Sequence, residues 1–88
     1  MPSVQDFRVA LKAQLYRAQK RGLPHIDIKA GELHRRVGGY PAQSHLMPSC
    51  CEAMYAEKRT SDVIIARPPE GKGASLTIRY KLPRRANV

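Results

Sequence analysis

The segment at residues 62–83, DVIIARPPEGKGASLTIRYKLP, constrains the fold more than any other part of the sequence. It holds two apolar runs, at residues 63–67 and 76–82, joined by a loop rich in proline and glycine. The second run alternates, with Leu76, Ile78, Tyr80 and Leu82 separated by Thr77, Arg79 and Lys81. This alternation predicts a β-hairpin with one buried face. Because an isolated hairpin is marginally stable in water, the preceding residues must supply another strand and a cover for that face.

Residues 3–21 are predicted to form the first helix. Its apolar residues recur at steps of three and four, and they are Val4, Phe7, Leu11, Leu15 and Ala18. This spacing gives one apolar stripe. Ser3 and Asp6 have the spacing of an N-terminal capping box, and Gly22 follows as a stop signal. The face opposite the stripe is basic and carries Arg8, Lys12, Arg17, Lys20 and Arg21. We expect that face to be solvated and to share in the attraction of nucleic acid.

A short strand and a second helix are predicted next. Ile26 and Ile28 alternate with Asp27, and a strand this short needs a sheet partner. Residues 30–37 are predicted to be helical, ending at Gly38 and Gly39. The predicted inward residues of this helix are Ala30, Leu33 and Val37, and the predicted outward residues are His34, Arg35 and Arg36.

A third helix is predicted to begin between residues 47 and 49. Pro48 suits a first helical turn, and Ser49 and Glu52 have capping-box spacing. The helix is expected to end near Arg59, where a turn cluster follows. Of the adjacent Cys50 and Cys51, we expect one to fill the core and the other to be half exposed.

The resulting order of helix, strand, helix, helix, strand and strand predicts an α+β fold. The short strand joins the hairpin as a three-stranded antiparallel sheet, and three helices pack on it. At 88 residues the chain has room for one small core. We expect a single domain over residues 1–83 and a basic flexible tail over residues 84–88.

Charge is the strongest indication of function. Sixteen Lys and Arg against seven Asp and Glu give a formal net charge of +9 and a sequence pI near 10.2. Such a surface favours polyanionic partners. DNA, RNA or an acidic membrane would satisfy this charge, and the alternative is that it only keeps a small protein soluble; the clustering of the basic residues favours nucleic acid.

Four segments together resemble the winged helix-turn-helix DNA-binding domain. They are IDI at residues 26–28, AGELHRRVGG at residues 30–39, MPSCCEAMYAEK at residues 47–58, and the hairpin with PPEGKGAS at its tip. The resemblance is one of architecture and covers nearly the whole chain. The string GELHRRVGGYP is also similar to stretches of short uncharacterised bacterial proteins.

The resemblance implies binding of double-stranded DNA by a small transcriptional regulator or accessory factor, of the phage or plasmid type. The third helix and its preceding turn would enter the major groove, and the hairpin wing would contact phosphates. The residues implied are Arg35, Arg36, Gln43, Ser44, His45, Ser49, Lys58, Arg59, Lys72, Arg79, Lys81, Arg84 and Arg85. Glu52 and Glu57 precede the first cation of the third helix, so contacts from the turn, wing and tail are expected to dominate.

Two other partners stay open. Structured RNA suits the same charge, although few aromatic residues are available to stack on single-stranded bases. An acidic protein surface, of the kind an anti-defence factor would bind, also suits it. A homodimer would double the footprint on DNA.

We expect no enzymatic activity, no cofactor and no metal. Adjacent cysteines on a helix point about 100° apart, and zinc sites use pairs at longer spacing. No apolar run approaches the roughly 18–20 residues of a membrane span. The first residues also lack a signal-peptide pattern. The expected location is the cytoplasm, in association with the nucleoid, with both cysteines reduced.

Overall fold

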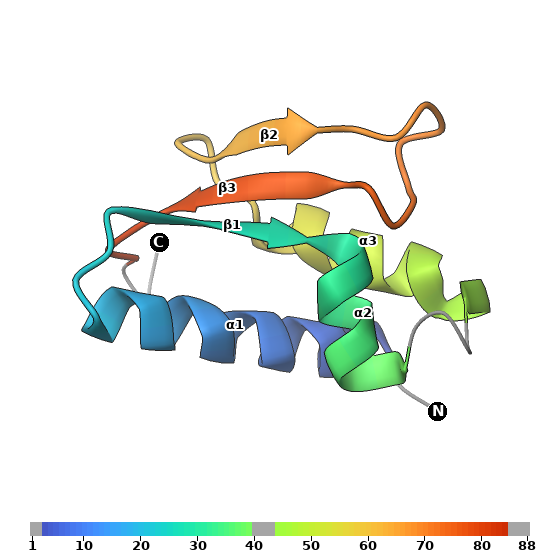
Figure 1. Cartoon of the computed structure of the whole chain (residues 1–88), viewed down its shortest axis with the longest axis horizontal. Helices are drawn as coiled ribbons and strands as arrows, with labels where there is room; N and C mark the ends of the chain where they lie inside the picture. Colours follow the sequence, from blue (N-terminus) through green and yellow to red (C-terminus); the bar gives the residue numbers. More distant parts are fainter. Residues whose placement is uncertain (1–2, 40–43, 85–88) are drawn as a thin grey trace.

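Figure 1 shows the computed structural model, which describes residues 3–39 and 44–84. Its elements are α1 (Val4–Lys20), β1 (His25–Lys29), α2 (Ala30–Gly38), the 3-10 turn η1 (Ser44–Leu46), α3 (Met47–Glu57), β2 (Val63–Ala66) and β3 (Thr77–Lys81). The predicted α+β organisation, with three helices and a three-stranded antiparallel sheet, is confirmed for this part of the chain. Gln43 and Arg85 lie outside the described residues.

The short strand β1 joins the C-terminal hairpin, as predicted. β3 is the central strand, and both β1 and β2 pair with it in antiparallel fashion. Ile26 lies opposite Tyr80, and Ile28 lies opposite Ile78. Figure 1 shows the helices on one side of this sheet. The alternation in β1 and β3 turns their apolar side chains toward the helices and leaves the other sheet face exposed.

Helix α1 supplies one wall of the core. Phe7, Leu11, Leu15 and Ala18 are buried, in agreement with the predicted stripe. The capping box is also confirmed, because the Ser3 side chain accepts a hydrogen bond from the Asp6 backbone while the Asp6 carboxylate accepts one from the Ser3 backbone. Gly22 follows the helix with a φ of 79°, a conformation that glycine adopts without strain.

The β2–β3 loop folds back onto α2 and α3. Helix α2 has no side-chain cap at its N-terminus. Its first N–H groups donate instead to the loop, from Ala30 to Leu76 O at 2.8 Å and from Gly31 to Ala74 O at 3.0 Å. A helix leaves its first N–H groups without partners inside the helix, so these two bonds replace a cap. The loop is therefore held against the N-terminus of α2.

Two more contacts hold the same loop to helix α3, and a third joins α3 to α2. The Tyr55 hydroxyl donates to Gly71 O, and the Cys51 thiol donates to Gly73 O. On the other side of the helix, the Cys50 thiol donates to Ala30 O. Cys50 and Cys51 are both fully buried, so the prediction that one of them is half exposed is wrong. One packs toward α2 and the other toward the loop, which explains why neither reaches solvent.

Two further predictions about the helices are corrected. Ser49 does not cap α3, because the helix already begins at Met47 and Ser49 falls within its first turn. His34 does not point outward, because it is fully buried with its ring 5.3 Å from the ring of Phe7. The missing side chain of Gly38 leaves room for this imidazole, since a Cβ there would lie 2.7 Å from a ring carbon.

We predict that Gly38→Ala destabilises the fold by about 1–3 kcal/mol through overpacking against His34. Elsewhere in a helix the same change would stabilise by roughly 0.5–1 kcal/mol. Urea denaturation of Gly38→Ala, His34→Ala and the double variant measures the coupling. In the His34→Ala background, Gly38→Ala should be neutral or stabilising. Equal costs in both backgrounds would contradict this packing account.

Candidate nucleic-acid interface

The exposed face of helix α3 carries little positive charge. Pro48, Glu52 and Ala56 are exposed along it at steps of four, and Ser49 is half-buried beside them. His45 is exposed in η1, just before the helix. The backbone of Ser44 begins η1. Helix α3 itself contains no basic residue, so His45 lies before it, Lys58 and Arg59 lie after it, and the body of the helix presents a glutamate.

Lys58 and Arg59 follow directly after α3. Lys58 is the C-cap residue, and its ammonium group donates to Arg59 O at 3.3 Å. Both side chains are half-buried. Arg59 also lines a cavity between α1 and α3. These two residues are therefore separated from η1 by the length of the helix.

The outer face of the sheet carries two of the predicted residues. Arg79 and Asp27 lie opposite each other in β3 and β1, and two hydrogen bonds join their side chains at 2.8 and 3.2 Å. These bonds hold the pKa of the Asp27 carboxyl below its ordinary value. The charge of Arg79 is therefore already balanced, whereas Lys81 is exposed without a carboxylate in the described structure.

Arg84 is anchored, in contrast to the flexible tail predicted to begin there. Its guanidinium contacts both carboxylate oxygens of Asp62 at 3.0 Å and donates to Glu57 O at 2.7 Å. Asp62 also accepts N–H bonds from Arg59 and Lys81. Both side chains of the pair are nearly inaccessible, with 9% and 0% exposure. The charge of Arg84 is thus used inside the fold, and its role in nucleic-acid binding stays a prediction.

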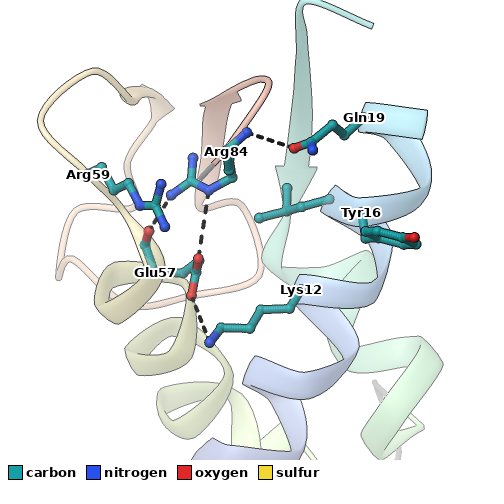
Figure 2. Close-up of a pocket in the computed structure, with 7 residues that line it drawn as sticks. Lys12, Tyr16, Gln19, Glu57, Arg59 and Arg84 are labelled. Carbon is teal, nitrogen blue, oxygen red and sulfur yellow. Dashed lines mark hydrogen bonds and ion pairs between the residues drawn. The ribbon is translucent and has the colours of Figure 1, made fainter. Parts of the chain in front are cut away.

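Figure 2 shows the cavity beside this pair, between α1 and α3. It measures about 420 Å³. Its lining residues are Lys12, Leu15, Tyr16, Gln19, Glu57, Arg59 and Arg84. The buried carboxylate of Glu57 lies 3.8 Å from Arg8, 4.0 Å from Lys12 and 3.7 Å from Arg84. The Glu57 carboxylate thus faces several cations, so the positive charge on this flank of α1 has a counter-charge within the fold.

The opposite flank of α1 contains a hollow of about 190 Å³ that is lined by three arginines. Arg17 and Arg21 come from the end of α1, and Arg36 comes from the last turn of α2. Gln14, Ala18 and Ile26 complete the lining. No carboxylate of the described chain forms an ion pair with these arginines. We refer to this place as the arginine hollow.

The β2–β3 loop forms a shallower depression of about 310 Å³. Lys72 and Arg67 line it together with Tyr55, Gly71 and Glu70. Here the positive side chains share the surface with a glutamate. Lys72 is exposed, as expected for a residue at the tip of the loop.

The structure thus distributes the predicted residues over several surfaces. It groups Arg59 with Arg84, and Arg36 with Arg17 and Arg21, but neither group with Lys72. Arg17 and Arg21 were not among the predicted site residues. Their i,i+4 spacing on the basic face of the first helix was the available signal. Arg35 is exposed beside Arg36 on α2.

The described residues include neither a cluster of metal-binding side chains nor a membrane-spanning helix. They contain no group of three or more His, Cys, Asp or Glu side chains arranged to hold a metal ion. None of their helices combines the length and the apolar character needed to cross a bilayer. Comparison with protein-family models, curated proteins and solved structures gave no match.

We predict that breaking the buried Arg84–Asp62 pair costs far more than breaking the exposed Arg79–Asp27 pair. Arg84→Met leaves a buried carboxylate without its cation, which should cost about 3–5 kcal/mol of unfolding free energy. Arg79→Met should cost less than about 1 kcal/mol, because its pair is exposed by 43% and 39%. Urea denaturation of both variants measures the difference, and equal costs would contradict the anchoring of Arg84.

Burial raises the pKa of both cysteine thiols, that of Cys50 to about 12. Both groups therefore stay protonated below about pH 9, and the nucleophilic thiolate is scarce. We predict that a disulfide reagent at about pH 8 labels neither cysteine in the native protein. It should label both after unfolding in guanidinium chloride. Rapid labelling of the native form would show that α3 opens readily.

Proposed function

We propose that this protein binds double-stranded DNA, mainly through the phosphate backbone, as a small winged-helix regulator or accessory factor. Phosphate contacts position a protein on DNA, and base contacts specify the sequence. The proposed base-reading segment is the turn before α3 with the start of that helix. The proposed backbone contacts come from α2 and the β2–β3 loop.

The observation that carries the proposal is that most acidic side chains are engaged within the fold, whereas many basic side chains have no partner in it. Four carboxylates are engaged within the fold, with Asp6 in the cap, Asp27 on Arg79, and Glu57 and Asp62 around Arg84. Among the described cations, those without an ion pair, a side-chain hydrogen bond or a cation–π contact are Arg17, Arg21, Lys29, Arg35, Arg36, Arg67, Lys72 and Lys81. The folded surface is therefore rich in free positive charge, which attracts polyanions.

The arrangement of elements supports a winged-helix architecture. Two helices joined by a short connection, α2 and α3, precede a hairpin whose second strand pairs with β1. In helix-turn-helix proteins the second helix of such a pair enters the major groove with its N-terminal residues toward the bases. His45 and Ser49 occupy that end of α3.

Two features favour backbone contacts over base reading. The middle of the exposed face of α3 carries Glu52, whose negative charge disfavours entry of the body of this helix into a groove lined by phosphates and so limits base reading there. The β2–β3 loop is packed against Tyr55 and Cys51, so it contacts DNA as a fixed surface. We therefore expect modest sequence preference on top of substantial general affinity.

We predict a steep salt dependence for binding to a duplex. If about six to eight phosphates are neutralised, log affinity should fall with log salt at a slope of about −5 to −7. Fluorescence anisotropy with one labelled duplex, at several sodium chloride concentrations, measures the slope. A flat response would overturn the proposal. Tighter binding to a structured RNA of equal length would replace DNA with RNA as the partner.

Matched variants in the β2–β3 loop test its contribution. Removal of Arg67 and Lys72 in Arg67→Ala/Lys72→Ala should reduce the magnitude of the slope by about two and weaken all sequences alike. Glu70→Gln, in the same loop, should strengthen binding, because it removes the local negative charge. Selection from a random duplex library, with an RNA pool alongside, would reveal any preferred sequence.

A further inference from the structure

The arginine hollow and the cavity of Figure 2 lie on opposite flanks of one helix. At 100° per residue, the centre of Lys12, Tyr16 and Gln19 lies roughly 160° round α1 from that of Gln14, Arg17 and Arg21. Both places collect positive side chains. The Figure 2 cavity contains the Glu57 carboxylate, with Lys12 and Arg84 in ion-pair contact. The arginine hollow contains no acid among its lining residues.

The hollow therefore gathers like charges without a counter-charge from the described chain. Glu32, one turn before Arg36 on α2, forms no ion pair with it. Guanidinium groups around one hollow repel each other, and an anion between them turns that repulsion into attraction. Arginine presents its donors in a planar fork that matches the oxygens of phosphate, which lysine cannot do.

The other explanation for these arginines is stabilisation of helix ends. Arg17 and Arg36 lie in the last turns of their helices, where cations interact favourably with the helix dipole. That explanation accounts for arginines near each helix end taken separately. It does not require residues from α1 and α2 to line one hollow together with Gln14. The shared lining is the observation that points to a ligand.

The size of the hollow suits a phosphate group. Its volume of about 190 Å³ corresponds to about six water molecules at roughly 30 Å³ each. Four phosphate oxygens fit within that space, with room for bridging water. The hollow is open to solvent, because its three arginines are exposed. A phosphate that belongs to a long chain can therefore reach it.

We propose that the arginine hollow holds a phosphate group of the nucleic-acid backbone, at a place separate from α3 and the β2–β3 loop. Arg17, Arg21 and Arg36 donate to the phosphate oxygens, and Gln14 supplies a neutral donor at the edge. None of the residues that line the hollow comes from α3 or the loop. The identity of the phosphate as a DNA phosphate rests on the proposed function, whereas the affinity of the hollow for phosphate does not.

The first test is titration of the protein with inorganic phosphate, followed by NMR of the arginine Nε–H groups. Saturable shifts should appear at Arg17, Arg21 and Arg36, and not at Arg67 or Arg79. Sodium chloride at equal ionic strength is the control for screening. Equal shifts at all arginines, or shifts that chloride reproduces, would mean that phosphate acts only as a general counter-ion, and the proposal would be overturned.

The second test is a substitution that keeps the net charge. Arg17→Lys/Arg21→Lys/Arg36→Lys removes the guanidinium forks while retaining the general attraction to DNA. Affinity for a duplex should fall about fivefold or more, with a nearly unchanged salt slope. Arg79→Lys, at an exposed arginine whose charge is balanced by Asp27, is the matched control and should change affinity less than twofold. Circular dichroism of the triple variant checks that it is folded, and Arg36→Lys alone repeats the test with minimal disturbance.

The outcomes separate the two proposals. If the wild-type protein binds no duplex but phosphate shifts the hollow arginines, the proposed function fails and the phosphate site stands. If DNA binds with a steep salt slope but the triple lysine variant matches Arg79→Lys, the function stands and DNA binding by the hollow is overturned. If phosphate shifts the signals of the hollow arginines and the triple lysine variant also loses affinity for the duplex, the hollow is a site for the nucleic-acid backbone.

Discussion

Pairing of β1 with β3 is the interaction on which the rest of the structure depends. The two strands are far apart in sequence, and the Asp27–Arg79 bond across them spans 52 residues. β1 leads directly into α2, so the pairing fixes where α2 begins and places its first N–H groups against Leu76 and Ala74. Ile26 of the same strand lines the arginine hollow. Loss of this pairing would therefore separate Arg36 from the arginines of α1.

Helix α1 separates two groups of cationic residues that differ in their counter-charges. On one flank, Glu57 and Asp62 engage Arg8, Lys12 and Arg84, and the charges help to hold α3 and the C-terminal segment in place. On the other flank, Arg17, Arg21 and Arg36 have no such acid. The net charge of +9 is therefore a poor guide to where a ligand binds, because part of the positive charge is used structurally. The position of the buried acids is a better guide.

Much of the fold could be predicted from the sequence, because its elements follow local rules. The stripe of α1, its capping box and the alternation of β3 each arise from neighbours within a few residues. Burial of His34 could not be predicted in this way, since it depends on Phe7 from another helix and on the space beside Gly38. The anchoring of Arg84 could not be predicted either, because it depends on Asp62, and the sequence around Asp62 indicates only a turn. The arginine hollow escaped prediction because the approach of α2 to the end of α1 is a tertiary feature.

The contacts that tie the β2–β3 loop to α2 and α3 have a thermodynamic consequence for any partner that the loop meets. Tyr55, Cys51 and Gly31 hold successive loop residues in place through hydrogen bonds. The ordering entropy of that segment is therefore lost during folding and not at the moment of association. Recognition by this surface should resemble the docking of two rigid bodies, with a small heat-capacity change and rapid association.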